Sequence, residues 1–184
     1  MDSFLTIKAE ATGLYKEKGS KFLSFAFPVQ SEDDIKRFLE KLRKEYHDAR
    51  HHCYAYILKA DQSQFRANDD GEPNHSAGDP ILGKIRSRNL TNTLVVVVRY
   101  FGGTKLGVSG LINAYKTAAS DSLDKIEVRR IIITQPIELE FEYGVTNEVI
   151  RLVHEFSLEL SNQKFNEPCK ISALIPPADR DKFI

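Results

Sequence analysis

The sequence predicts an α+β protein that is divided into two domains. Residues 94–98 are apolar on both alternating faces, which is typical of a central strand covered on two sides. Ser31, followed by three acidic residues and by apolar side chains at helical spacing, is the start signal of a helix. A second, shorter set of strand and helix patterns follows position 131, so we expect domains at 1–130 and 131–184.

In the first domain, residues 5–10 and 22–29 read as strands, and the polar residues 15–20 as the connection between them. The helix that begins at Ser31 is followed by a strand at 52–58. Residues 61–79 are polar, rich in turn formers and without periodicity, so we expect a long functional loop there. Asp79 and Pro80 then suit the cap and first residue of a helix that runs to about position 88.

The strand at 94–98 leads into a glycine-dense turn and a helix capped by Ser109, with an apolar side formed by Leu111, Ile112, Tyr115 and Ala119. Residues 127–133 are strand-like. The second domain reads as a strand at 137–143 after the interruption at Pro136, a helix at 146–159, and strands at 162–165 and 169–175. Residues 178–184 begin one further helix.

Composition places limits on the class of protein. At 184 residues and 41% hydrophobic content the chain can bury a core without the help of disulfides or structural metal ions. Cys53 and Cys169 have no C-x-x-C spacing, which indicates reduced thiols and no disulfide partner. The first residues lack the basic start of a signal peptide, and no segment is apolar enough to span a membrane. We therefore expect a cytoplasmic protein, and the oligomeric state stays open.

The net charge is zero, but it is unevenly distributed. Up to Arg130 there are 21 basic and 17 acidic residues, net +4, and after it 5 basic and 9 acidic residues, net −4. This asymmetry is compatible with a basic domain that meets phosphate or an acidic partner, and equally with ordinary solvated surfaces.

Five ordered motifs carry a resemblance to a known family. They are V-R-Y-F-G-G-T-K-L-G at 98–107, D-D-G-E-P at 69–73, A-G-D-P-I-L at 77–82, R-H-H-C-Y-A-Y at 50–56 and K-G-S-K-F at 18–22. With them the chain resembles the bacterial branch of the IMPACT/YigZ family. The resemblance implies an amino-terminal βαβ domain like those of ribosomal proteins and of domain IV of elongation factor G. It also implies a ferredoxin-like carboxyl-terminal βαββ(αβ) domain, which looks shortened at its end.

For function, the resemblance implies a non-enzymatic regulator of translation that binds ribosome-associated RNA or protein. Eukaryotic members are implicated in restraining the stress kinase that phosphorylates an initiation factor, by competing for the activating partner of that kinase. They carry an additional recruiting domain, so that contact is not transferred to this chain. No cofactor is implied.

The glycine-dense turn is the first candidate site. Its spacing fits neither G-x-x-x-x-G-K-[ST] nor G-x-G-x-x-G, so it is not a nucleotide-binding loop. Two interpretations stay open. The glycines are needed for a tight turn from strand to helix, or they form a surface that binds the backbone of RNA or of a protein. The candidate contacts for nucleic acid or a partner are Lys18, Lys21, Arg86, Arg99, Tyr100, Phe101, Gly102, Gly103, Lys105 and Gly107.

A polar cluster of His52, Asp69, Asp70 and Glu72 is the second candidate. A metal loop is one reading, but the spacing suits neither calcium nor zinc, and we expect no metal. The favoured reading is an acidic turn whose carboxylates pair with Arg99 or cap the following helix. Family members usually carry a Ser-Gly pair where this chain has Asn74 and His75.

Catalysis is the alternative reading of the same residues. Adjacent strand residues face opposite sides, so His52 and Cys53 do not form a dyad, and Cys53 reads as a small buried side chain. His52 is expected to join Arg99, and a metal-dependent or small-molecule hydrolase built on Asp70, Glu72, His52 and Arg99 is one alternative function. We assign no catalytic residue. A further alternative is a module that binds protein only, anchored by Tyr100 and Phe101.

Overall fold

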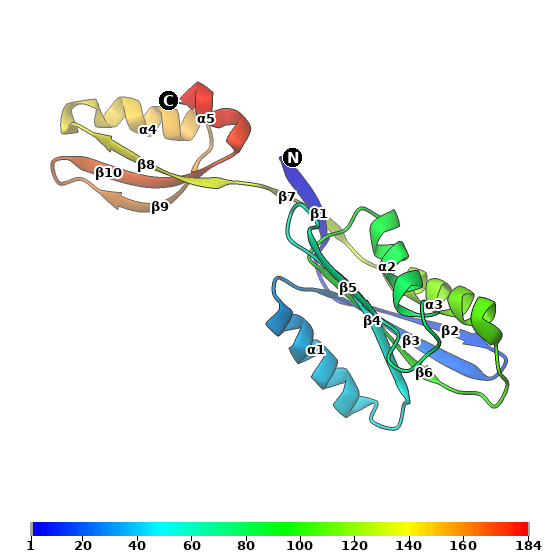
Figure 1. Cartoon of the computed structure of the whole chain (residues 1–184). Helices are drawn as coiled ribbons and strands as arrows, with labels where there is room; N and C mark the ends of the chain where they lie inside the picture. Colours follow the sequence, from blue (N-terminus) through cyan, green and yellow to red (C-terminus); the bar gives the residue numbers. More distant parts are fainter. Residues whose placement is uncertain (1, 184) are drawn as a thin grey trace. The chain divides into compact units, whose positions relative to one another are not determined.

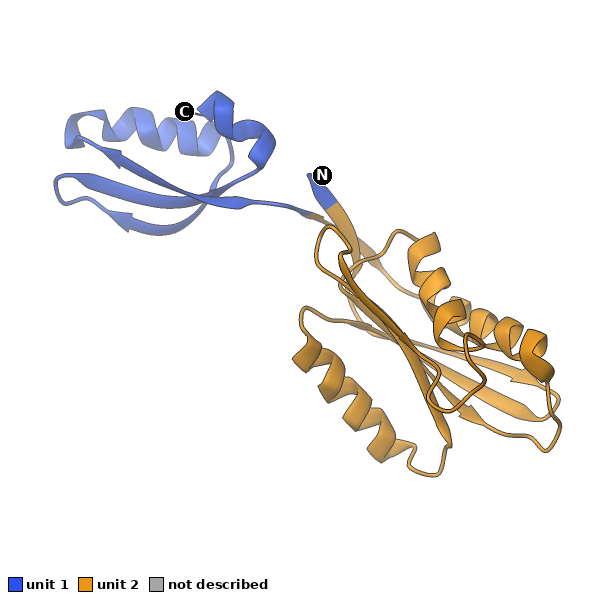
Figure 2. Ribbon diagram, in the orientation of Figure 1, with its two compact units in different colours: residues 1–3, 132–184 blue, residues 4–131 orange. Residues whose placement is uncertain are grey.

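The computed structural model describes residues 2–183, which form two compact units (Figure 1). Residues 4–131 make up one unit, and the other described residues make up the second (Figure 2). Both units combine strands and helices, so the expected two-domain α+β class is confirmed. No helix within residues 2–183 is long and apolar enough to cross a membrane.

The amino-terminal unit is built on one five-stranded antiparallel sheet in the order β2-β3-β6-β4-β5. A separate pair, β1 and β7, forms a two-stranded sheet. The elements of this unit are β1 (Ser3–Ile7), β2 (Ala11–Glu17), β3 (Ser20–Pro28), α1 (Glu32–Glu45), β4 (His51–Leu58), β5 (Gln64–Asn68), α2 (Gly78–Ser87), β6 (Thr93–Tyr100), α3 (Gly107–Leu123) and β7 (Val128–Ile132).

Strand β6 is central because both of its faces are covered. Val95 and Val97 pack in the layer that α2 and α3 close, whereas Val96 and Val98 pack in the layer that α1 closes. Figure 1 shows the same arrangement, with α1 on one face of the sheet and α2 and α3 on the other. The predicted double-sided strand is therefore confirmed.

Helix α1 begins where the sequence indicated. The Ser31 hydroxyl accepts a hydrogen bond from the Asp34 backbone N–H at 3.2 Å, which satisfies one of the free donors of the first turn. Its buried residues Ile35, Leu39 and Leu42 lie on one face.

Two edge strands differ from the sequence prediction. β2 extends into the segment read as a connection, and its tight turn to β3 consists of Lys18 and Gly19, with φ of 46° and 81°. β5 lies inside the segment read as a loop. Each strand is at an edge of the sheet and has no buried residue, so neither carries the apolar run of a central strand.

The predicted helix caps at Asp79 and Ser109 were both wrong. Helix α2 already begins at Gly78, with Ala77 in the cap position, and Asp79 lies in its first turn. Helix α3 begins at Gly107 with Leu106 in the cap position and no side-chain cap, so Ser109 lies inside the helix.

The carboxyl-terminal unit contains β8 (Gln135–Phe141), the 3-10 turn η1 (Tyr143–Val145), α4 (Thr146–Glu155), β9 (Glu159–Lys164), β10 (Cys169–Ile175) and α5 (Pro177–Phe183). Its sheet is antiparallel in the order β8-β10-β9, as in a ferredoxin-like βαββ arrangement. Pro136 lies inside β8 and pairs with Leu174. An edge strand tolerates proline, which explains why it does not end the strand. The core of this unit includes Val153, Leu158, Ala173 and Ile175.

Candidate functional site

The glycine-dense turn packs directly against the β2–β3 turn. A Cβ atom on Gly102 would meet the Gly19 carbonyl carbon at 1.9 Å, so only glycine fits at position 102. The Gly102 backbone N–H donates to the Ser20 hydroxyl at 3.1 Å. This packing brings two segments that are far apart in sequence to one end of the sheet.

A buried ion pair lies behind this turn. Arg99, near the end of β6, donates through Nη1 to Oε1 of Glu72 at 2.5 Å, and the two side chains are only 7% and 4% exposed. The hydroxyl of Tyr115 on α3 donates to the same oxygen at 2.8 Å. Nε of Arg99 has no hydrogen-bond partner among the described residues. The expected pairing of an acidic-turn carboxylate with Arg99 is confirmed.

Asp69 has the other expected role, because it caps α2. Its Oδ1 accepts from the backbone N–H groups of Ala77 and Gly78 at 3.0 and 2.8 Å, and its Oδ2 accepts from the N–H of His75 at 2.8 Å. Asp69, nine residues before Gly78, thus accepts from the backbone N–H groups at the start of α2, a role that was expected of Asp79. Within residues 2–183, no three His, Cys, Asp or Glu side chains are grouped as metal ligands would be.

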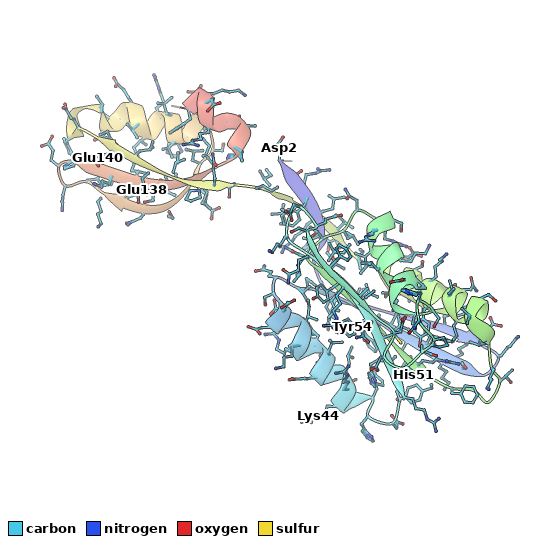
Figure 3. All side chains as sticks on the ribbon, viewed as in Figure 1. Asp2, Lys44, His51, Tyr54, Glu138 and Glu140 are labelled. Atoms are coloured by element: carbon cyan, nitrogen blue, oxygen red, sulfur yellow. The ribbon has the colours of Figure 1, made fainter. Side chains whose placement is uncertain are left out.

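The two histidines of β4 occupy opposite faces of the sheet. Arg99 pairs across the strands with His51, and cross-strand partners share a face. His51, labelled in Figure 3, places Nε2 4.0 Å from Oε1 of Glu72. The prediction that His52 joins Arg99 is therefore wrong by one residue.

His52 instead lies on the face that α1 covers. Its backbone N–H donates to Oδ2 of Asp70 at 2.7 Å, and its Nδ1 is 4.0 Å from the same oxygen. Burial lowers the pKa of His52, although the nearby Asp70 carboxylate opposes that shift. The four residues of the hydrolase alternative consequently do not converge, since the side chain of His52 lies on the opposite face of the sheet from Arg99.

Cys53 is buried beside the ion pair and is not an accessible nucleophile. Its Sγ lies 3.0 Å from the carbonyl oxygen of Asp69 and 3.3 Å from the hydroxyl of Tyr115. Burial raises the pKa of both the Cys53 thiol and the Tyr115 hydroxyl above their ordinary values. Tyr115 was assigned only to the apolar side of its helix, and helical periodicity contains no signal for the polar contacts of its hydroxyl.

A groove of about 440 Å³, which we call the β6–α3 groove, opens at this end of the domain. Phe101 stands at its mouth, is 53% exposed, and lies with its ring centroid 5.7 Å from the Arg99 guanidinium. The N-terminus of α3 forms part of the wall, and its first turn contains no acidic residue. The lining residues are Arg50, His51, Glu72, Pro73, Arg99, Phe101, Lys105, Leu106, Gly107, Val108 and Leu111.

Most of the predicted contact residues gather here. Exposed cations from the two turns and from the segment before β4 surround this end of the sheet, and no ion pair involves any of them among residues 2–183. We call this set the basic edge; it consists of Lys16, Lys18, Lys21, Arg50 and Lys105.

Two predicted contacts lie outside the β6–α3 groove. Arg86 stacks over Phe65 at 4.4 Å, on β5 at the opposite end of the sheet. Tyr100 turns toward the α1 side and donates its hydroxyl to Asp48 at 2.7 Å. Burial and that hydrogen bond raise the pKa of Tyr100 to about 12. Tyr100 and Phe101 therefore do not form a joint anchor.

Comparisons with known proteins place this site in a family context. Residues 18–123 match the family described as the Impact N-terminal domain. IMPACT family member YigZ of Escherichia coli (strain K12) is 30% identical over 185 residues, covering 100% of this chain and 91% of that protein. IMPACT family member YvyE of Bacillus subtilis (strain 168) is 29% identical over 183 residues, covering 100% and 84%. A solved structure entitled "Crystal structure of an hypothetical protein" has a TM-score of 0.76 at 30% identity, covering 100% of this chain and 90% of that one.

Proposed function

The chain belongs to the IMPACT family, and from that premise we propose that it is a non-enzymatic regulator of translation that binds ribosome-associated RNA or protein. The role in translation is the one that the family resemblance implies. A cytoplasmic location is part of the same proposal, because ribosomes are found there.

The basic edge is the observation that carries the proposal. It supplies exposed cations from three segments at one end of the amino-terminal unit, and none has an ion-pair partner among the described residues. Unpaired surface cations attract phosphate groups and acidic surfaces over roughly a Debye length, about 8 Å at physiological salt. Phe101 adds an exposed apolar side chain beside them.

The titratable groups behind the edge favour binding over catalysis. Glu72 is held by Arg99 and Tyr115, and Asp69 is used in capping α2. Side chains that are already hydrogen-bonded and buried serve to hold the turns in place. The rigid turns then present the exposed cations in a fixed arrangement.

Sedimentation with ribosomal subunits and with total RNA, across a salt series, tests this function. The informative variant combines Lys21→Ala with Lys105→Ala, and the matched control combines Lys36→Ala with Lys59→Ala, which removes the same charge at exposed lysines outside the candidate contacts. We expect salt-sensitive binding that the first variant weakens. If the lysines bind phosphate, the slope of log affinity against log salt should fall by about 0.7 to 0.9 for each phosphate that is no longer neutralised.

Equal weakening in both double variants would indicate a general effect of net charge and contradict binding at the basic edge. Absence of ribosome and RNA binding at low salt would contradict the proposed function itself.

A further inference from the structure

The β6–α3 groove has the composition of a side-chain pocket. Pro73, Phe101, Leu106, Val108 and Leu111 supply apolar walls. Its volume of about 440 Å³ lies within the range of small-ligand pockets, about 300 to 1,000 Å³. The groove is therefore large enough to bury one or two apolar side chains of a partner.

Its apolar residues are exposed where they line the mouth. Phe101 is 53% exposed and Val108 is 52% exposed, so two large apolar side chains stand together in water. Neither is needed to fill the core, which Leu111 and Tyr115 close beneath them. Adjacent exposed apolar side chains in a concave surface mark an interaction site.

The charges around the groove select an anionic partner. Arg50 and Lys105 stand at its wall, and neither belongs to an ion pair within residues 2–183. Glu72 is the groove's acidic residue, and Arg99 neutralises it at 2.5 Å. The first turn of α3 adds backbone N–H groups with no side-chain cap and no acidic residue. The Nε–H of buried Arg99 has no hydrogen-bond partner among the described residues, and it adds an unused donor but no further net charge, because Glu72 balances the guanidinium.

An acidic peptide fits these features better than RNA does. Grooves that bind single-stranded RNA carry aromatic side chains in succession, on which bases stack. Phe101 is the one Phe, Tyr or Trp among the residues that line this groove, the imidazole of His51 lies against Glu72 at 4.0 Å, and the apolar walls are otherwise aliphatic or proline. Aliphatic walls bury an aliphatic or aromatic side chain, while the cations pair with carboxylates on either side of it.

We infer that the β6–α3 groove binds an extended acidic peptide segment of a partner protein, with one or two apolar anchor side chains in the pocket and carboxylates on Arg50 and Lys105. The inference rests on the proposed binding role of this end of the domain, and it names the partner as protein.

Peptide titrations monitored by backbone amide chemical shifts of the full chain test the inference. The probe is the capped peptide Asp-Asp-Leu-Phe-Asp-Asp. Two control peptides replace either all Asp by Lys or the Leu-Phe pair by Ala-Ala, and a uridine hexanucleotide is the RNA probe. Each is added to about 5 mM, where binding with a dissociation constant of a few millimolar is still detected.

We expect the acidic apolar peptide to shift the amides of Gly107, Val108 and Leu111. This peptide should bind at least about tenfold more tightly than either control peptide. The Lys peptide is repelled by the cations of the groove, and the Ala-Ala peptide has no apolar anchor. Val108→Glu should abolish these shifts, and Lys105→Glu should reduce affinity at least about tenfold. Val128→Glu, at a valine that is 48% exposed on β7, is the matched control and should bind as the original chain does.

Three results would overturn the inference: no shifts at the groove, equal shifts from the basic peptide or the hexanucleotide, or equal weakening in Val108→Glu and Val128→Glu. Ribosome sedimentation separates this inference from the proposed function. If ribosomes bind through Lys21 and Lys105 while the peptide does not, the inference fails and the function stands. If the peptide binds while ribosomes do not, the inference stands and the proposed function fails.

Discussion

The Glu72–Arg99 pair should be the most sensitive polar interaction of the amino-terminal domain. Glu72→Gln keeps the shape of the side chain but removes its charge, leaving Arg99 buried at 7% exposure without a counterion. Breaking a buried pair from one side costs about 3 to 5 kcal/mol. The glutamine oxygen still accepts from Arg99 and Tyr115, so we expect the lower end, about 3 kcal/mol.

Native-state hydrogen exchange of the β6 amides measures this cost, because these amides report opening of the amino-terminal domain alone. A destabilisation of about 3 kcal/mol corresponds to exchange that is about a hundredfold faster. Tyr115→Phe, which removes one hydrogen bond to a charged group, should cost less, about 1.5 kcal/mol.

The matched control is Glu40→Gln on the exposed surface of α1, where we expect a change below about 0.5 kcal/mol. If Glu72→Gln changes β6 exchange no more than Glu40→Gln does, the buried pair does not hold this end of the domain together.

Three further predictions concern the close approach at Gly102, the two buried thiols and the buried imidazole of His52. Gly102→Ala forces a methyl group into the Gly19 backbone and should lower the free energy of unfolding in urea by about 3 kcal/mol. Gly103→Ala, with φ of 91° and open space around it, should lower it by about 1 to 2 kcal/mol. Equal losses would contradict the close approach of Gly102 to Gly19. Cys53 and Cys169 are buried, so iodoacetamide should modify neither until denaturant is added, and rapid native labelling would refute that burial. The pKa of His52 is lowered in the folded chain, so below about pH 6.5 the unfolded chain binds a proton that the folded chain excludes. The free energy of unfolding should therefore fall as the pH drops, by at most about 1.4 kcal/mol per pH unit. His52→Asn should flatten that part of the pH profile, and an unchanged slope would exclude His52 as its source.

The central elements of the fold were predictable because their signals are strong. Strand β6 is buried on both faces, and α1 combines a serine cap with an amphipathic period. The edge strands β2 and β5 were not predictable, since none of their residues is buried and polar residues there read as loop. Their strand conformation depends on pairing with β3 and β4, which is a tertiary effect.

The candidate site was predictable in its residue types but not in its geometry. The sequence indicated that the acidic turn serves Arg99 and a helix cap, and Glu72 and Asp69 have those roles. Strand alternation alone did not reveal which β4 histidine faces Arg99, because the answer depends on the register with β6. The hydroxyl of Tyr115 reaches Glu72 across 43 residues of sequence, and no local pattern contains such an interaction.

Site-specific photo-crosslinking in living cells can show whether this end of the domain contacts the translation machinery. A benzophenone amino acid replaces Phe101 at the mouth of the β6–α3 groove, and a second chain carries it at Phe65, which is 52% exposed at the opposite end of the sheet. We expect position 101 to crosslink to a ribosomal or translation-factor component and position 65 to give no such crosslink. Crosslinks at position 101 only to proteins outside translation, or the same products from both positions, would contradict it.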